Sequence, residues 1–265
     1  MNLRRYLSLL GQYSLQYAKV RMEHRWDFFL SVFTMTLATV FGLAVVFLIF
    51  GRAREMNGWS FDELLFLYGF SLIPMALFNV ISVNLYQFSD QYLIQGKFDR
   101  VLLRPIHSLF QILFEQLRIE ALGDAVLGLC ILAVAAPRLG IHAEPASILF
   151  LLASVLCGAL LYTAIFTMLA TVSFWLEDKV GVMPPVYNLI VFGRYPLDIY
   201  NPFLRVLLSW VVPFGFATFY PAAVVLRGDA YRIYAWLLPV VTAVFCAMAL
   251  WVWNRGIRSY SSTGS

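Results

Sequence analysis

Charged residues are scarce in this sequence. Asp, Glu, Lys and Arg make up 13% of the 265 residues and hydrophobic residues make up 61%, whereas soluble domains usually carry about 25% charged residues. A helix needs about 20 apolar residues to cross a bilayer core roughly 30 Å thick. One small soluble domain cannot bury many windows of that length, so the sequence predicts an all-α, polytopic membrane protein. Five such windows contain no charged residue: Phe28–Phe50, Leu64–Ser89, Pro145–Leu176, Val206–Leu226 and Ile233–Asn254.

Motifs for catalysis and metal binding are also missing. The three cysteines lie inside apolar stretches and are interpreted as small buried side chains. The three histidines are far apart, and neither H-E-x-x-H nor G-x-S-x-G occurs. Gly96-Lys97 is not a phosphate-binding loop, because no glycine stands five residues before Gly96. The sequence therefore predicts no enzyme, no metal site and no nucleotide site, so any ATP that drives the protein must bind to another subunit.

The net charge of +4 does not indicate nucleic-acid binding. The cations are spread among the loops between apolar segments. Anionic lipid headgroups suit that distribution better than a nucleic acid does. We therefore expect membrane lipids, and no nucleic acid, among the partners.

Six membrane spans are predicted, in one transmembrane domain over residues 1–265. Residues 1–26 precede them as an amphipathic helix on the membrane surface, because leucine and tyrosine recur there every three to four residues with cations between them. The spans are placed at 27–50, 64–89, 109–136, 147–173, 180–198 and 232–254.

The distribution of cations predicts the orientation. Five Lys or Arg residues precede the first span, and the connection at 90–104 holds three more, whereas the connection near 137–145 holds one. Short cytoplasmic loops are enriched in Lys and Arg. Both termini are therefore predicted to be cytoplasmic, and the number of full crossings is even.

Seven apolar segments conflict with an even number of crossings, so one of them must enter and leave by the same face. Residues 203–226 are the best candidate, because Pro213, Gly215 and Pro221 interrupt the helix, and a proline in a helix interior costs about 3 kcal/mol. We predict a re-entrant segment there. The alternative is a full span at 203–226, with residues 177–200 partly in the interface.

The connection at 90–105 is the most informative polar segment. Leu102 and Leu103 lie on one side of a short predicted helix, one turn after Phe98, and Pro105 ends it. Arg100 and Arg104 form an i,i+4 basic pair on another side. Such a helix can place apolar side chains in a partner's groove while its cations contact the rim. The residues alone equally allow an interfacial helix that touches only lipid headgroups.

Three motifs in the same order resemble a small-permease family among the bacterial type-2 ATP-binding-cassette (ABC) exporters. They are RMEHRWDFFLSVF before the first span, GKFDRVLLRPIHSLFQ after the second, and RYPLDIYNPFLRVLLSWVVPFGFATFYPA near the C-terminus. Together they extend over almost the whole chain. The resemblance implies a permease subunit in the bacterial inner membrane that exports a small molecule, lipid or drug-like compound; some members are known as exporters of viologen-like cations.

The resemblance also implies partners. A second permease half, identical or homologous, would complete the path, and a cytoplasmic dimer of ABC ATPases would bind ATP and Mg and supply the energy. The segment 90–105 would be the coupling helix that contacts the ATPase. Its predicted contact residues are Gly96, Lys97, Phe98, Asp99, Arg100, Leu102, Leu103 and Arg104.

Ionisable residues in or near the predicted spans need partners, because charges in a membrane are costly. Asp124 either attracts a cationic substrate into a cavity or pairs with an arginine of a neighbouring helix, and we favour the second interpretation. Glu115 and Arg118 are expected to pair at the cytoplasmic interface. Arg194 and Asp198 are expected to clamp the turn before the re-entrant segment. For the translocation path the candidates are Asp124, the two asparagines of the second span and four aromatic residues of the re-entrant segment: Asn79, Asn84, Asp124, Phe214, Phe216, Phe219 and Tyr220.

Two other functions are compatible with a polytopic membrane protein. A secondary transporter driven by protons would use the Glu120 and Asp124 carboxylates and work without an ATPase; such transporters usually contain internal repeats, and none is visible here. A membrane scaffold would transport nothing and would tolerate changes to the aromatic residues of 203–226.

Overall fold

Helices account for almost all regular structure in the computed structural model. It describes residues 25–50, 55–142, 144–176 and 183–261. Within these ranges the only β-type pairing is an isolated bridge between Met56 and Trp59. The prediction of an all-α protein is confirmed. The predicted amphipathic helix at 1–26 lies almost wholly outside the described residues.

Five helical segments in the described ranges are long and apolar enough to cross a membrane. This confirms a polytopic membrane protein. They consist of α2 (Arg25–Phe50), α3 (Phe61–Ile81), α7 (Leu122–Arg138) with the preceding turn η2 (Ile119–Ala121), α8 (Pro145–Thr171) with the following turn η3 (Val172–Phe174), and α13 (Arg232–Ser259).

The start of α3 illustrates how local sequence sets a helix boundary. The Glu63 amide donates to the Ser60 hydroxyl at 3.3 Å, and the Ser60 amide donates to Glu63 Oε2 at 2.7 Å. This reciprocal capping box satisfies two amides that the first helical turn leaves without partners. The polar cap fixes where the charge-free stretch after Glu63 enters the bundle.

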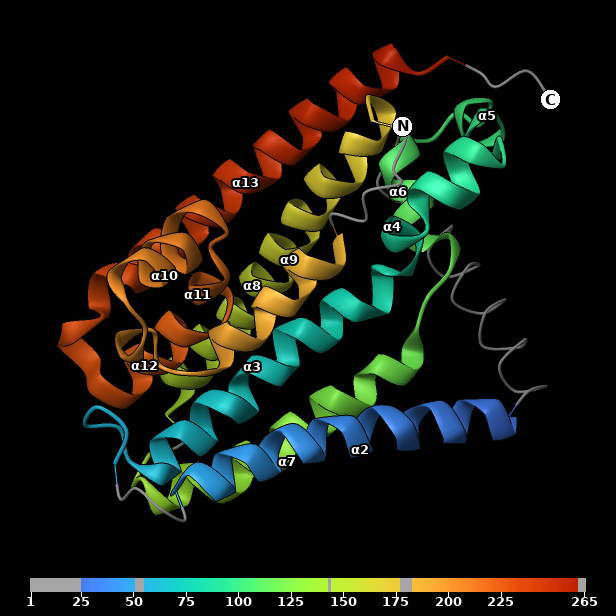
Figure 1. Cartoon of the computed structure of the whole chain (residues 1–265). Coiled ribbons are helices and arrows are strands. Elements are labelled where there is room, and N and C mark those ends of the chain that lie inside the picture. The colour runs from blue at the N-terminus through green and yellow to red at the C-terminus, as the bar shows by residue number, and fades with distance from the viewer. Residues whose placement is uncertain (1–24, 51–54, 143, 177–182, 262–265) are drawn as a thin grey trace.

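The long helices form a bundle that runs between two ends (Figure 1). One end, called the α5 end, holds five short elements: α4 (Val83–Tyr86), the π-helix η1 (Phe88–Ile94), α5 (Lys97–Leu102), α6 (Ser108–Glu115) and η2. The opposite end holds the turn at 56–59 between α2 and α3. Two helices predicted as continuous are broken at the α5 end. The segment 64–89 is divided among α3, α4 and η1, and 109–136 is divided at the extended residue Gln116.

The sixth predicted span, 180–198, lies partly outside the described residues. Its described part consists of α9 (Met183–Leu189), η4 (Ile190–Arg194) and η5 (Leu197–Ile199). Tyr187 contacts Asn79 near the end of α3, whereas Arg194 contacts Tyr68 near its start. This segment therefore runs antiparallel to α3, away from the α5 end. Its crossing of a membrane stays a prediction.

The segment predicted as re-entrant folds into α10 (Pro202–Val206), the π-helix η6 (Leu207–Val211), α11 (Phe214–Ala217) and α12 (Phe219–Arg227), with η7 (Gly228–Ala230) leading to α13. Asn57 donates to the Asp198 carbonyl before the segment, and Arg227 donates to the Gly58 carbonyl at its end. Both ends thus lie at the turn 56–59. The chain enters and leaves at one end of the bundle, as a re-entrant segment would, and its depth in a membrane stays a prediction.

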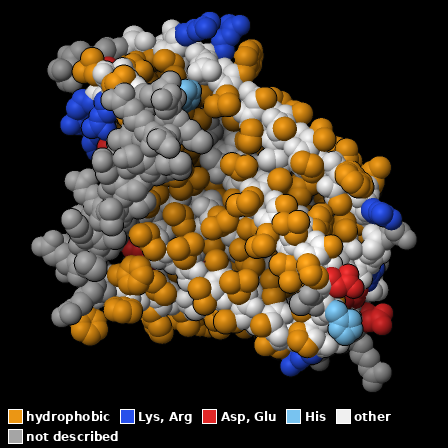
Figure 2. Space-filling view, turned by 180° about the vertical axis from the view of Figure 1, so that it is seen from behind, with side chains coloured by type: hydrophobic (Ala, Val, Ile, Leu, Met, Phe, Trp, Pro, Cys, Tyr) orange, Lys and Arg blue, Asp and Glu red, His pale blue; other side chains and the backbone are white. Residues whose placement is uncertain are grey.

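The central helix of the bundle is α3. In its apolar window 78% of the residues are buried, against 6% for α2. Two glycines let α3 approach α7 closely, because a Cβ added to Gly128 would lie 2.6 Å from the Gly69 carbonyl oxygen. Apolar side chains cover most of one flank of the molecule, while charged side chains gather toward its ends (Figure 2). Such a flank requires lipid or another apolar surface against it.

Candidate functional site

The short helix α5 extends from the end of the bundle (Figure 1). It begins after Gly96, whose φ of 69° is in the left-handed region that favours glycine. Leu103, directly after the helix, is 84% exposed, and Leu102 is 44% exposed. Arg100 and Arg104 are exposed beside them. The predicted combination of apolar side chains and cations is therefore present on an accessible surface.

Phe98 lies on the other side of α5, and here the prediction needs correction. Its side chain is fully buried within this chain, with ring centroids 4.9 Å from Tyr260, 5.3 Å from Phe174 and 5.8 Å from Phe88. It cannot enter a partner's groove. Burial of an aromatic ring contributes several kcal/mol to folding, so Phe98 holds α5 against the bundle. Leu102 and Leu103 remain as the apolar side chains at the end of α5 that a partner can contact.

The last helix fastens α5 in place. The Tyr260 hydroxyl donates to Asp99 Oδ1 at 3.0 Å, and the Trp253 indole donates to the Ser108 hydroxyl of α6 at 3.0 Å. Burial and the hydrogen bond to the Asp99 carboxylate raise the pKa of Tyr260 to about 12. Asp99, a predicted partner contact, thus bonds within the chain. Any force on α5 is transmitted directly to the end of α13.

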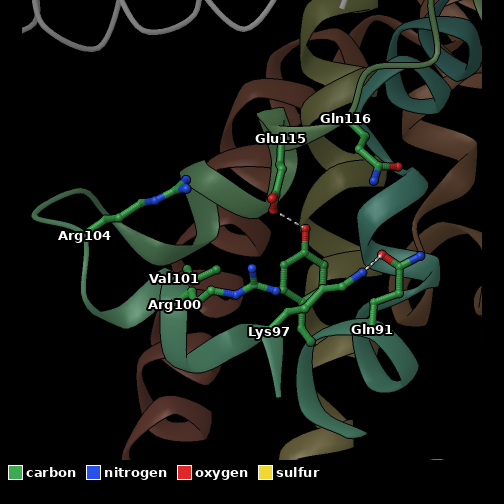
Figure 3. A pocket seen from close by; sticks show the side chains of 8 residues that line it. Gln91, Lys97, Arg100, Val101, Arg104, Glu115 and Gln116 are labelled. Atoms are coloured by element: carbon green, nitrogen blue, oxygen red, sulfur yellow. Dashed lines mark hydrogen bonds between the residues drawn. The ribbon is translucent and has the colours of Figure 1, made fainter. Parts of the chain in front are cut away.

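A basic pocket of about 150 Å³ lies between η1, α5 and the end of α6 (Figure 3). Lys97 donates to Gln91 Oε1 at 3.2 Å, and Tyr92 donates to Glu115 Oε2 at 2.5 Å. Burial, together with this bond to Glu115, raises the pKa of Tyr92. Arg100 and Arg104 complete the lining, so three cations surround one carboxylate. The expected pair of Glu115 with Arg118 does not form, because the extended Gln116 separates them and Glu115 faces Tyr92 instead.

The two asparagines of the second span have different surroundings. Asn84 is fully buried and donates to the Ile112 carbonyl at 2.6 Å, so it fastens α4 to α6 and does not line a path. Asn79 contacts the Tyr187 hydroxyl at 3.4 Å and lines a second pocket, of about 360 Å³. Only Asn79 therefore keeps the predicted position at an opening.

Residues 33–264, well over half of the chain, match the family profile of the ABC-2 family transporter proteins. The chain belongs to this family. It is a permease subunit of the type-2 class of ABC transporters, a multi-pass membrane component that works with an ABC ATPase and is not itself that ATPase. No curated protein and no solved structure matches it.

Asp124 of the ABC-2 permease lies in a polar network that joins four elements. Thr39 of α2 donates to Asp124 Oδ1 at 2.8 Å, and Tyr68 of α3 donates to the Thr39 carbonyl at 2.8 Å. Arg194 of η4 donates to Tyr68 at 3.4 Å, and its positive charge acts on the Asp124 carboxylate. The arrangement agrees with the structural interpretation of Asp124. No geometry here favours contact with a cationic substrate.

Arg194 and Asp198 do not form the expected clamp. Arg194 is directed at Tyr68 and at the Met75 sulfur, 3.2 Å away. Asp198 instead accepts a hydrogen bond from the Tyr231 hydroxyl and lies 3.8 Å from Arg205. The 3₁₀ turn of η5 and the intervening Pro196 separate the two side chains, because i,i+4 residues face each other only in a continuous helix.

The four aromatic candidates of the re-entrant segment are at most 5% exposed. They are held by other rings and hydroxyls: Tyr220 stacks on Tyr234 at 3.9 Å and shares a hydrogen bond of 2.7 Å with Ser209. Within the single chain they therefore pack the segment, and their positions give no support to contact with a transported solute. The residues in question are Phe214, Phe216, Phe219 and Tyr220.

Several residues at the two pockets, or in contact with α5 and α6, were not identified from the sequence. They contact their partners over long separations, such as the 161 residues between Asp99 and Tyr260, and a lone tyrosine after an apolar helix gives no signal of this. The residues that the sequence reading missed are Tyr86, Tyr92, Tyr187, Trp253 and Tyr260.

Proposed function

We propose that this permease exports a small molecule, lipid or drug-like compound across the inner membrane of a bacterium. Both termini and α5 face the cytoplasm, and a second permease half, identical or homologous, completes the path. A dimer of ABC ATPases binds ATP and Mg on the cytoplasmic side. Membership of the ABC-2 family supports the partnership with an ATPase. The position and surface of α5 carry the rest of the proposal.

The α5 surface fits a docking helix. Leu102 and Leu103 form its apolar tip, and Arg100 and Arg104 are exposed beside it. Apolar anchors in a partner's groove supply most of the binding energy, whereas exposed cations steer the approach. The tip belongs to a helix whose other face is buried against η3 and α13. A partner that binds the tip therefore acts on a rigid body.

Energy transfer requires a difference in binding. A conformational change follows from ATP only if the ATPase binds the α5 tip with different affinity in its two states. Through the contacts of Phe98 with Trp253 and of Asp99 with Tyr260, displacement of α5 then moves the end of α13. In that arrangement α3, α9 and α13 change their positions relative to the second half and open the path outward.

Leu103→Asp tests the coupling assignment. The tagged permease is purified from its host in mild detergent together with the ATPase that accompanies it. ATP hydrolysis is then compared between the wild-type permease and the variant. Because Leu103 is 84% exposed, the variant should insert and fold normally. We expect loss of the ATPase or of its permease-dependent hydrolysis. Arg258→Asp, an exposed change at the same end on α13, serves as the control and should keep both.

The same experiment separates the rival functions. A proton-driven transporter would transport without any ATPase, and a scaffold would tolerate Leu103→Asp. Full permease-dependent hydrolysis in Leu103→Asp and Leu102→Asp alike would remove α5 as the coupling element. Asp124, one of the two carboxylates that a proton-driven transporter would use, accepts a hydrogen bond from Thr39 and is subject to the positive charge of Arg194.

A further inference from the structure

The second pocket has a composition suited to one class of ligand. It has a volume of about 360 Å³ and lies between the end of α3, α4, the linker before η2, and α9. Its polar and aromatic lining contrasts with the apolar flank of the molecule. Its principal side chains are Asn79, Ser82, Tyr86, Arg118, Tyr187 and Asn188.

Among the described residues that line this pocket, Arg118 is the only Lys, Arg, Asp or Glu. Its amide donates to the Val80 carbonyl at 2.8 Å, which fixes the backbone beside α3, while the side chain is exposed. Within the described part of the chain Arg118 forms no ion pair. The pocket therefore has a positive charge whose hydrogen-bond donors are available to a ligand.

The nearby carboxylates are placed elsewhere. Glu115 accepts from Tyr92 in the basic pocket on the other side of Gln116. Glu120 is 2% exposed and does not line the pocket, and Asp124 accepts from Thr39. Consequently, no described carboxylate lines this pocket or forms an ion pair with Arg118.

Two tyrosines form the aromatic wall. The rings of Tyr86 and Tyr187 meet edge to face at 5.6 Å, and both pack on Phe166 of α8, at 5.7 Å and 6.1 Å. Asn79 holds the Tyr187 hydroxyl. The wall is thus fixed by packing on a buried ring, and it offers flat apolar faces next to amide and hydroxyl groups.

The depth of the pocket matches a lipid headgroup boundary. Twenty residues of α3 at about 1.5 Å each cover roughly 30 Å, the thickness of the hydrocarbon core. Counted from the capped start of α3, this distance ends near Ile81, in the middle of the Asn79–Tyr86 stretch that lines the pocket. An amphiphile in the leaflet on the α5 side would have its head at this level.

We propose that this pocket is the entry site for an anionic amphiphile, whose head binds Arg118 and whose ring or chain packs on Tyr86 and Tyr187. This inference rests on the proposed transport function and names its substrate class. A cation of the viologen type would be repelled by Arg118 at close range. The lining thus separates this permease from the cation exporters that the motifs of the sequence also resemble.

The test measures binding and needs no ATPase. The full-length permease is purified into nanodiscs of zwitterionic lipid. Two environment-sensitive fluorescent probes share one dodecyl chain and one naphthalene ring, and differ in the head, a sulfonate or a trimethylammonium. We expect tighter binding of the sulfonate probe. Arg118→Gln should weaken it roughly tenfold, about the contribution of one hydrogen bond to a charged group, without weakening the trimethylammonium probe.

Two controls make the result specific. Arg258→Gln removes an exposed cation on α13 at the same end, so it should leave both affinities unchanged if Arg118 acts locally. Tyr187→Ala removes the shared aromatic wall and should weaken both probes by the same factor. An effect of Arg258→Gln equal to that of Arg118→Gln would reduce the observation to general surface charge and overturn the proposal.

Other outcomes also decide the matter. Binding of the trimethylammonium probe as tight as that of the sulfonate probe would overturn the proposal. This holds also if that probe binds to Glu177 or Asp178, which lie outside the described residues. Failure of the transport proposal is seen separately: the wild-type permease would then co-purify with no ATPase and support no ATP hydrolysis, whichever probe it binds more tightly. Intact coupling without any sulfonate preference would reject the anionic substrate class alone.

Discussion

The Tyr260 hydroxyl donates a hydrogen bond to Asp99 across a distance of 3.0 Å. The bond joins the end of the last long helix to α5, the short helix that exposes Leu102 and Leu103. With the aromatic packing of Phe98 on Phe88, Phe174 and Trp253, it makes the α5 end one mechanical unit. A docking surface on α5 can act on the bundle only because this unit is rigid.

The Tyr260–Asp99 bond has a predicted pH signature. The pKa of Tyr260 is raised to about 12 by burial and by the Asp99 carboxylate, against about 10 for a free tyrosine. The neutral phenol is thus favoured in the folded state. Its stabilising contribution should be complete below about pH 10 and lost as the pH rises through about 12.

The phenolate absorbance difference between wild type and Tyr260→Phe measures this titration. We expect a midpoint near pH 12. Asp99→Asn removes the negative charge and should move the midpoint down toward 10. A midpoint near 10 in the wild type would contradict the hydrogen bond.

Substitutions of Phe98 and Leu103 should differ in their effect on the free energy of unfolding. Phe98→Ala removes a fully buried ring and should lower the free energy of unfolding by about 3–5 kcal/mol. Leu103→Ala changes a side chain that is 84% exposed and should alter it by less than about 0.5 kcal/mol. Thermal unfolding in detergent measures both. Equal effects of the two substitutions would mean that α5 does not pack as described.

Gly128→Ala should weaken the contact between α3 and α7. The added Cβ would lie 2.6 Å from the Gly69 carbonyl oxygen, which is backbone and cannot rotate away. We expect a loss of about 1–3 kcal/mol. Gly123→Ala on the same helix is the matched control, because its Cβ would meet side-chain atoms, of Val32 at 3.3 Å and of Thr36 at 3.6 Å. A thermal midpoint for Gly128→Ala no lower than that of the control would reject the close approach.

Asp124→Asn should affect stability and not substrate selection. Asparagine can still accept the hydrogen bond from Thr39, but it loses the attraction to Arg194. We expect a thermal midpoint lower by roughly 2–4 °C, the equivalent of about 1 kcal/mol for a protein of this size. Transport by the reconstituted complex, divided by the amount of folded protein, should equal that of the wild type. Unchanged stability together with lost transport would restore Asp124 as a substrate contact.

The candidate site was predicted in part. The exposure of Leu102 and Leu103 follows from their place in a short polar segment ended by Pro105. The burial of Phe98 could not be read from spacing, because it depends on Phe174 and Trp253, which are distant in sequence. For the same reason the contact predicted from the i,i+4 spacing of Arg194 and Asp198 was wrong, because each side chain bonds to a residue of another element.

The sequence by itself determined that this protein lies in a lipid membrane and that it is helical. Long windows without charge are read directly from the sequence. In lipid, the backbone of such a window can satisfy its hydrogen bonds only within a helix. Only the tertiary structure decided which polar and aromatic side chains face an opening and which hold the bundle together. Arg118 faces a pocket while Asp124 is bonded to Thr39. The reason is that a polar group in an apolar environment is stabilised by a hydrogen bond or an ion pair, and the packing of the helices decides which partner lies at bonding distance.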